Sequence, residues 1–488
     1  MQSDVRVRRS SLFFLIALVP AIAQLVCFVV VLVKRARYPM DLEWLEGAQL
    51  YEAFRFAHGL PVYGPPAQGF VPSPYPPLFH VVAGALGWCF GFDYWNGRVV
   101  SDASIAVVIA VQSVVVVRAA PSRRIGWVLA AMGAAAVAAS YRPLEASMDL
   151  ARVDMMGFAI VSLAGALAVR RPLGACRAAV VGALLCAAVY TKQTNLFYTA
   201  FILGFVAWRD RRGALVSLGV AVALAVPILV ALQRASAGWF WIWMTVMRHH
   251  ALVPEKCAVA GLGVAAAAAG LGALLLALRR RGWLGEASRF WCALLAVSVV
   301  ACVGPMLTGG GWVNNLIGLV LTAIVAGLLL LCDVLRNAAD SATAERWVVA
   351  TLSALLLGAL YDPMRYVPDA ARSRDVDALH AMMRTLDGDV VAPMYPFVAV
   401  RDSKETPQIS LVAYLDTVGP ERLNADAAES LRDKHPKWVV LFGHPQEDGV
   451  RAWLGPEYSG ERLDLRVQAL QETTGDSMTL LRLGDAAP

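Results

Sequence analysis

The feature that most constrains this chain is a series of uninterrupted apolar blocks separated by short loops that carry arginine. Residues 214–232 and 258–278 are two such blocks. A helix of about 20 apolar residues spans the hydrocarbon core of a bilayer. The chain is 58% hydrophobic and 16% charged, whereas an ordinary soluble domain is about 25% charged. We therefore predict a mainly α-helical, polytopic transmembrane bundle.

The arginines between the blocks predict which helix ends face the cytoplasm. Residues 76–91 form an apolar block of only 16 residues, and prolines precede it closely. If this block lies on the outer surface, six basic clusters fall on the cytoplasmic side, as the positive-inside rule favours; if it crosses, the later clusters fall outside. The clusters are Arg6/Arg8/Arg9, Arg118/Arg123/Arg124, Arg170/Arg171/Arg177, Arg209/Arg211/Arg212, Arg279/Arg280/Arg281/Arg289 and Arg336/Arg346.

This arrangement predicts about eleven spans in the cytoplasmic (inner) membrane of a bacterial-type cell, with a cytoplasmic N-terminus and an extracytoplasmic, periplasmic C-terminus. The spans lie near residues 11–33, 98–117, 125–140, 155–169, 178–190, 196–208, 214–232, 258–278, 290–307, 313–331 and 347–361. The two blocks on either side of residues 191–195 have only about 13 residues, fewer than a full crossing needs. We expect them to form a hairpin whose polar tip lies in a cavity lined by protein.

Composition divides the chain into two domains. Residues 1–361 contain the predicted spans and a long first outer loop, residues 34–97, in which we expect helices at the membrane surface. Residues 362–488 are more charged and combine an amphipathic stretch, 376–386, with three short apolar runs. These runs are residues 390–391, 438–442 and 478–481. The pattern predicts a small soluble α/β domain outside the membrane.

Charge and cysteine content exclude other classes. The net charge of +6 comes from arginines at span ends rather than on one stripe, so we predict membrane lipids and no nucleic acid as partners. The eight cysteines form no C-x-x-C pair, and most lie in or beside apolar blocks. Neither a disulfide framework nor a cysteine zinc site is expected.

Four carboxylates follow the first span within a dozen residues: Asp41, Glu43, Glu46 and Glu52. Glu43 and Glu46 are three residues apart and share one face if the segment is helical. Carboxylates held near apolar material have raised pKa values and accept a proton near neutral pH. The alternative is that they are solvated charges that balance the basic residues just before them.

The order of short motifs around these acids resembles a known superfamily. The first loop contains EWLEG at 43–47, HGLPVY at 58–63, YPPLF at 75–79 and GRVVS at 97–101. Later elements are ARVD at 151–154, YTKQ at 190–193, WFWIW at 239–243 with RHH at 248–250, and GGGWVNN at 309–315. Together they resemble the C-type (GT-C) integral membrane glycosyltransferases, which include protein O-mannosyltransferases and the aminoarabinose transferases of lipid A.

The resemblance implies sugar transfer from a polyprenyl-phosphate donor to a hydroxyl of a glycan, lipid or protein, with inversion, on the outer side of the membrane. It implies a carboxylate base among Asp41, Glu43 and Glu46, with Glu46 slightly favoured because a glycine follows it. Many relatives have an aspartate before this glutamate, and here Leu45 takes that position. The resemblance also pairs Asp154 with the first-loop acids across one active site.

Several further residues are candidates for binding the substrate or its phosphate: Lys192, Arg152, Tyr75, His249, His250, Asn314 and Asn315. Each polar type also has a structural alternative. Lysine at a span end snorkels or caps a helix, arginine forms an ion pair with a nearby acid, and asparagine caps a helix. The histidine pair with loop carboxylates would suit a divalent metal, which is left open because a spaced third ligand is not visible.

Two other functions compete with the enzyme. Polytopic proteins with polar residues inside the membrane are often transporters, so a lipid or glycan flippase is one alternative. A catalytically inactive glycosyltransferase-like subunit is the other, because Leu45 departs from the motif. The acids lie in outer loops, and no internal repeat is visible, which favours the enzyme.

Overall fold

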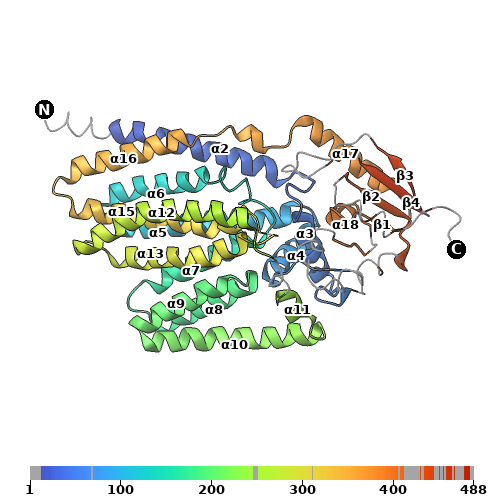
Figure 1. The fold of residues 1–488 in the computed structure, drawn as a ribbon, viewed down its shortest axis with the longest axis horizontal. Coiled ribbons are helices and arrows are strands. Elements are labelled where there is room, and N and C mark those ends of the chain that lie inside the picture. The colour runs from blue at the N-terminus through green and yellow to red at the C-terminus, as the bar shows by residue number, and fades with distance from the viewer. Residues whose placement is uncertain are drawn as a thin grey trace.

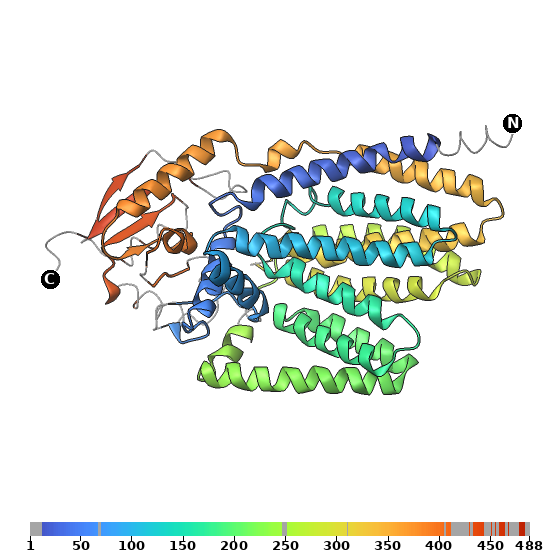
Figure 2. The same ribbon diagram turned by 180° about the vertical axis from the view of Figure 1, so that it is seen from behind.

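The computed structural model describes residues 12–66, 70–245, 251–309, 311–404 and 407–410, and beyond them residues 429, 433–443, 450, 454, 458–463, 467 and 478–483. The molecule is elongated (Figure 1). A bundle of helices aligned with the long axis forms one part, and a small sheet with its own helices lies at the far end. The first outer loop lies between these two parts (Figure 2).

Each of the eleven segments predicted to cross the membrane contains a helix. The helices are α2 (Val19–Ala36), α5 (Trp95–Ala119), α6 (Arg123–Ala139), α7 (Val153–Ala168), α8 (Ala175–Thr191), α9 (Asn195–Arg209), α10 (Arg211–Ala235), α12 (Pro254–Arg280), α13 (Glu286–Ser298), α15 (Ile317–Asn337) and α16 (Ser341–Gly358). A π-helical turn, Val299–Val303, and the short α14 (Gly304–Met306) continue α13.

Length and apolarity identify several of these helices as membrane spans. Within the described residues, five are long and apolar enough to cross, and the bent pair Ser341–Gly358 and Pro363–Thr385 would add a sixth. The five are Leu12–Ala36, Trp95–Ala119, Arg211–Ala235, Glu286–Met306 and Val313–Asn337. Helices α7, α8 and α9 have 16, 17 and 15 residues, and at 1.5 Å per residue each is shorter than the hydrocarbon core. The chain is thus a multi-pass membrane protein, and the number of eleven spans stays a prediction.

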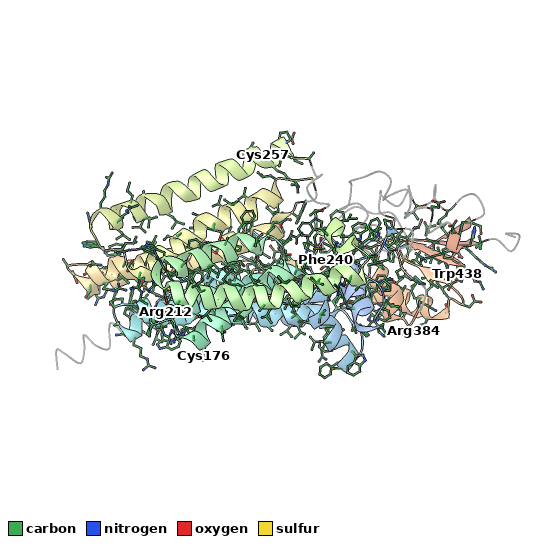
Figure 3. All side chains as sticks on the ribbon, turned by 90° about the horizontal axis from the view of Figure 1, so that it is seen from below. Cys176, Arg212, Phe240, Cys257, Arg384 and Trp438 are labelled. Carbon is green, nitrogen blue, oxygen red and sulfur yellow. The ribbon has the colours of Figure 1, made fainter. Side chains whose placement is uncertain are left out.

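The basic loops lie together at one end of the bundle. Cys176 and Arg212 mark this end in Figure 3, whereas Trp438 and Arg384 mark the end with the sheet. Because the helices alternate in direction, the loops after α5, α7, α9, α12 and α15 all lie at the same end. These loops carry five of the six predicted cytoplasmic clusters, and the sixth lies before the described residues. This arrangement is the one that the positive-inside argument requires.

Two helices of the first outer loop, α3 (Glu46–Ala57) and α4 (Leu78–Phe90), lie at the opposite end of the bundle (Figure 1). Helix α4 has 13 residues, about 20 Å, too short to cross a bilayer. It presents Trp88 and Phe90 outward, as a helix at a membrane surface does. Gly84 lets α4 pack against α3, because a Cβ there would lie 2.5 Å from the carbonyl oxygen of Ala53.

The C-terminal region contains α17 (Ala370–Thr385), α18 (Pro396–Arg401) and a four-stranded sheet. The strands are β1 (Val390–Val391), β2 (Trp438–Leu441), β3 (Tyr458–Arg462) and β4 (Thr479–Leu483), in the order β1-β2-β4-β3. Strand β1 pairs parallel with β2, and the other two pairings are antiparallel, with Val439 opposite Leu481. The three apolar runs of the sequence are strands, as predicted. Strand β3 was missed because its sequence, YSGER, is polar, as suits a strand at the edge.

The C-terminal region shares a hydrophobic core with the first outer loop. One cluster of buried side chains joins the loop, from Tyr38 to Tyr94, to the core of the sheet. Polar contacts reinforce the junction: one ring nitrogen of His380 lies 2.8 Å from the carbonyl oxygen of Pro39 and the other 2.6 Å from Asp402. The predicted boundary at residues 361 and 362 stays a prediction, and the two parts pack as one core.

Candidate active site

The site lies at the end of the bundle opposite the basic loops, where the first loop meets three other segments. These are the turn before α7, the α8–α9 hairpin tip at residues 191–195, and the 3-10 helix Val313–Leu316. Most of the acids and cations singled out in the sequence lie there and are buried. Their partners differ, and the partners decide what each group can do.

Asp41 is held by two donors inside the protein. Its carboxylate accepts hydrogen bonds from the Gly47 backbone N–H and from the Tyr94 hydroxyl, at 2.6 Å for the latter. Burial raises its pKa well above the usual value, and the charge of Glu46 adds to the effect. Glycine at residue 47 allows this close approach, because a Cβ there would lie 2.7 Å from an Asp41 oxygen and displace the carboxylate. Asp41 therefore fixes the turn into α3.

Both oxygens of the Glu46 carboxylate accept two hydrogen bonds each. Its Oε2 lies 2.8 Å from Nη2 of Arg98 and 2.7 Å from the Leu42 N–H, and its Oε1 lies 3.0 Å from Nε of Arg98 and 2.7 Å from the Ala151 N–H. Burial alone would raise the pKa of Glu46, but Arg98 and the two backbone donors hold it below its usual value. A carboxylate with four donors stays charged and has no oxygen left for a substrate proton.

Arg98 is a structural centre that the sequence analysis did not single out. Besides Glu46, its guanidinium donates to the carbonyl oxygens of Arg35, Tyr38 and Met40, at 2.6–3.0 Å. These contacts fold the first residues of the outer loop back onto the start of α5. The signal in the sequence was an arginine at the beginning of a predicted span, where a buried charge is costly unless it is paired.

Glu43 is the first-loop acid that faces the other charged groups. Its Oε2 accepts from the Leu45 N–H at 3.1 Å, and its Oε1 lies 3.0 Å from Nη1 of Arg152. Burial raises the pKa of Glu43, and the charge of Arg152 opposes this only in part. The raised pKa makes Glu43 a stronger base than an ordinary glutamate.

A chain of alternating charges continues from Glu43. Arg152, which also lies 3.5 Å from Asp154, connects the two acids. Asp154 is in the first turn of α7, where the helix dipole favours an acid, and its Oδ1 accepts from Lys192 at 2.6 Å. The Lys192 ammonium also donates to Asn315 Oδ1 at 2.8 Å. The resemblance placed Asp154 and a first-loop acid in one site, and here both contact the same guanidinium.

Two asparagines form hydrogen bonds with the charged groups at the end of this chain. Asn314 donates to the second oxygen of Asp154 at 3.1 Å, and Asn315 donates to the carbonyl oxygen of Trp312 at 3.2 Å. Both sit in the 3-10 helix that leads into α15. In this arrangement the two amides position Asp154 and Lys192.

The hairpin tip also contacts the YPP segment of the first loop. Gln193 donates from Nε2 to the carbonyl oxygen of Pro74 at 2.7 Å, and the Tyr75 hydroxyl is close enough to Lys192 to interact with its charge. Lys192 and Tyr75 thus come together from positions more than 100 residues apart. The expected polar tip in a cavity lined by protein is present: Thr191, Lys192 and Asn195 are buried.

A small pocket opens beside Lys192 and Asp154. Its space of about 20 Å³ holds about one water molecule. The wall includes residues that the sequence analysis missed: Phe158, Asn195, Tyr198, Cys302 and Gly318. Tyr198 and Asn195 are polar groups one turn apart at the start of an apolar helix, a signal that would have indicated them.

The aromatic segment 239–243 holds the end of α10 against the first outer loop. Within α11 (Trp239–Thr245), Trp243 is buried and its indole N–H donates to the carbonyl oxygen of Gly64 at 3.0 Å. Trp241 is exposed, as an interfacial tryptophan would be. Helix α11 thus ties the end of α10 to the first outer loop.

The histidine pair, His249 and His250, lies outside the described residues. In the part of the chain that the structure does describe, no three His, Cys, Asp or Glu side chains are grouped so that they would hold a metal ion. A divalent metal therefore stays an open proposal of the sequence.

Solved structures with a similar fold are membrane glycosyltransferases. ArnT from Cupriavidus metallidurans in the apo state matches with a TM-score of 0.52 at 14% identity, over 98% of this chain and 98% of ArnT. ArnT bound to undecaprenyl phosphate matches at 0.47 and 16%, over 87% and 78% of the two chains. The oligosaccharyltransferase AglB from Archaeoglobus fulgidus, in complex with an inhibitory peptide and a dolichol-phosphate, matches at 0.45 and 12%, over 86% and 69%.

No family model and no curated protein sequence matches this chain. The likeness to apo ArnT covers nearly the whole of both chains and includes the outer loop and the C-terminal region. ArnT is a member of the C-type glycosyltransferase superfamily that the sequence motifs resemble. The chain therefore has the fold of the C-type integral membrane glycosyltransferases.

Proposed function

We propose that this protein transfers a sugar from a polyprenyl-phosphate donor to a hydroxyl acceptor on the outer side of the cytoplasmic membrane. The observation that supports the proposal is the buried chain Glu43–Arg152–Asp154–Lys192, in which two acids alternate with two cations within a C-type glycosyltransferase fold. ArnT, whose apo structure shares this fold, also crystallises bound to undecaprenyl phosphate.

The reaction needs few groups from the protein. The acceptor oxygen forms a bond to the anomeric carbon, the bond from that carbon to the phosphate oxygen breaks, and the phosphate leaves with the electron pair. Attack from the face opposite the leaving group inverts the anomeric centre. Because phosphate is a good leaving group, no general acid is required, unlike in glycoside hydrolysis. A base takes the acceptor proton, and cations stabilise the phosphate charge.

Glu43 is the base in this proposal. The Glu46 carboxylate accepts four hydrogen bonds. The Asp41 carboxylate accepts from the Gly47 N–H and the Tyr94 hydroxyl. Glu43 has a raised pKa and faces the charged chain through a single arginine. The sequence slightly favoured Glu46 as the base. The proposal names Glu43 instead, because Glu46 already accepts four hydrogen bonds within the protein.

Lys192 and Arg152 hold the donor phosphate in this proposal. An ammonium has three N–H donors. In Lys192 one donates to Asp154 and one to Asn315, so the third remains for a phosphate oxygen. Asp154 and Asn314 position the two cations. The space beside Lys192 is small, so the sugar must enter with a rearrangement of the pocket wall.

The test is an activity measurement on the purified full-length protein. A panel of synthetic undecaprenyl-phosphate sugars is supplied with acceptor glycans or lipids extracted from the host, and release of undecaprenyl phosphate is followed by mass spectrometry. We expect release with at least one donor and none with Glu43→Gln. Asp377→Asn, an exposed acid in α17, is the matched control and should keep full activity.

Two outcomes would contradict the proposal. A folded wild-type protein that releases no undecaprenyl phosphate from any donor would favour an inactive subunit. Movement of an intact lipid-linked sugar across liposome membranes, without cleavage, would favour a flippase. Comparing surface glycans between the wild-type strain and a deletion strain would then name the missing sugar.

A further inference from the structure

A second pocket lies at the basic end of the bundle, far from the charged site. It has a volume of about 440 Å³, within the roughly 300–1,000 Å³ typical of ligand pockets. Arg170, Arg171 and Arg209 line it, together with Asp210 and the ends of α7 and α9. Cys176 and Arg212, which neighbour these loops in the sequence, lie at this end in Figure 3.

The acids at this pocket already have partners. Asp210 caps α10 by accepting from the Gly213 N–H at 3.0 Å. Glu286 forms ion pairs with Arg209 and with Arg171, the latter at 3.4 Å. Neither carboxylate is left to neutralise Arg170.

Arg170 lies in an electropositive environment. The charges of Arg118 and Arg177 both act on it, and its pKa is lowered by burial first and by these two neighbours next. Among the residues that the structure describes, no carboxylate forms an ion pair with Arg170. In this described part of the chain, Arg170, Arg171 and Arg209 thus face only the two carboxylates of Glu286 and Asp210, and the pocket keeps an excess of positive charge. Such a pocket suits an anion with several oxygens, because each guanidinium presents a fork of N–H donors.

The position of the pocket indicates where that anion comes from. Helix α7 ends at Ala168, so Arg170 and Arg171 lie just beyond it, and Arg209 is the last residue of α9. Trp208, the residue before Arg209, is 78% exposed, and exposed tryptophans at helix ends mark the level of lipid headgroups. Basic pockets between helices on the cytoplasmic side are the kind that hold anionic headgroups.

We propose that the pocket between the α7–α8 loop and the end of α9 binds the phosphate of an anionic membrane lipid of the inner leaflet, with Arg170, Arg171 and Arg209 as its ligands. This site is separate from the sugar-transfer site, and lipid binding there is measurable whether or not the chain has transferase activity.

The experiment measures lipid binding to the purified full-length protein by native mass spectrometry and by thermal unfolding. The probes are phosphatidylglycerol, phosphatidylcholine with the same acyl chains, and free glycerol phosphate. We expect the wild type to bind phosphatidylglycerol more tightly than phosphatidylcholine. Arg170→Gln should weaken binding of phosphatidylglycerol about fivefold, the effect of one arginine near a charged headgroup. Arg280→Gln, an exposed arginine of another loop at the same end, is the control and should change it little.

A readout without lipid separates binding from a structural role. Removing one of three like charges relieves repulsion, so Arg170→Gln in detergent alone should unfold at the same temperature as the wild type or a higher one. Equal binding of the two lipids, or an equal loss with Arg170→Gln and Arg280→Gln, would overturn the proposal. Binding of free glycerol phosphate as tight as that of the lipid would overturn the assignment to a membrane lipid.

Discussion

Glu43 and Glu46 are residues of the same type, three positions apart, with different surroundings. Glu46 accepts from Arg98 and from two backbone N–H groups, whereas Glu43 contacts Arg152 and one N–H. The sequence predicts that a carboxylate of this loop matters. It cannot predict which one, because the donors that occupy Glu46 lie 52 and 105 residues farther along the chain.

This difference gives a prediction for two amide variants. Glu46→Gln leaves Arg98 buried without its counter-charge, so we expect a loss of stability on the order of 3–5 kcal/mol. Glu43→Gln should lower turnover about 10²–10⁴-fold and cost less stability than Glu46→Gln, because Asp154 still pairs with Arg152. Thermal unfolding and donor cleavage are measured on the same preparations. A Glu43→Gln protein that is fully active would exclude Glu43 as the base.

Glu52 gives a prediction on the pH dependence of stability. Burial raises its pKa to about 8, although the Ser73 backbone N–H donates to it at 2.6 Å. The folded state therefore binds the Glu52 proton more tightly than the unfolded state, whose Glu pKa is about 4.3. This contribution is fully present below the unfolded pKa and is lost as the pH rises through about 8.

We expect the wild type to lose stability relative to Glu52→Gln between about pH 5 and pH 8, by a few kcal/mol. Burial lowers the pKa of the neighbouring His80 to about 3, so His80 acts in the opposite direction below its unfolded pKa of about 6.5. Comparing the two proteins at each pH isolates the effect of Glu52. Parallel stability curves for the two proteins would show that Glu52 titrates normally.

At the scale of elements, the apolar pattern predicted the position of every bundle helix, because burial in lipid or protein needs little more than apolar length. Helix α4 and the three apolar strands also coincide with apolar runs of the sequence. The pattern could not predict how the elements pack. The hairpin tip contacts the YPP segment through one hydrogen bond that spans 119 residues, and no local pattern encodes such a pairing.

In the candidate site, too, the sequence indicated individual residues but not their contacts. The candidates Glu43, Arg152, Asp154, Lys192 and Asn315 lie in one connected chain. The residues that the sequence did not indicate were those whose role is to fix others in place. Arg98 and Tyr94 are the main examples, because their function depends entirely on partners distant in sequence.

The hairpin tip carries the third prediction. If Lys192 binds the donor phosphate, Lys192→Met should raise the KM for the donor about tenfold or more, since a charge-assisted hydrogen bond contributes roughly 1.5–3 kcal/mol. Lys256→Met is the matched control: Lys256 lies near the same end of the bundle, but it donates to the carbonyl oxygen of Thr308, and in the described part of the chain it forms no ion pair.

Rate and stability together separate the roles of Lys192. A purely structural ion pair with Asp154 would make Lys192→Met less stable with an unchanged KM and rate per folded molecule. Asp154→Asn should reduce turnover as well as stability, because Arg152 and Lys192 both lose their position. An unchanged turnover in Asp154→Asn would remove Asp154 from the site.

For the whole molecule, the basic loops at one end and the sheet at the other predict opposite accessibility across the membrane. Asp377 is exposed in α17, and Arg280 and the native Cys176 are exposed at the basic end. In variants that keep a single cysteine, a membrane-impermeant thiol reagent added outside intact cells should label Asp377→Cys. It should reach Cys176 and Arg280→Cys only after the membrane is opened. The reverse pattern would invert the topology.

The contact between Glu46 and the Ala151 N–H has a consequence for biogenesis. The ribosome delivers residue 46 to the membrane more than 100 residues before its partner. While the chain is being inserted, Arg98 can pair with Glu46, but the outer loop cannot complete its final shape until the turn before α7 has been translocated. The contact from His380 to Pro39 comes later still, near the end of synthesis. The charged site is therefore completed only after α7 has been inserted, and a nascent chain stalled before α7 would leave the acid-rich loop without its partners.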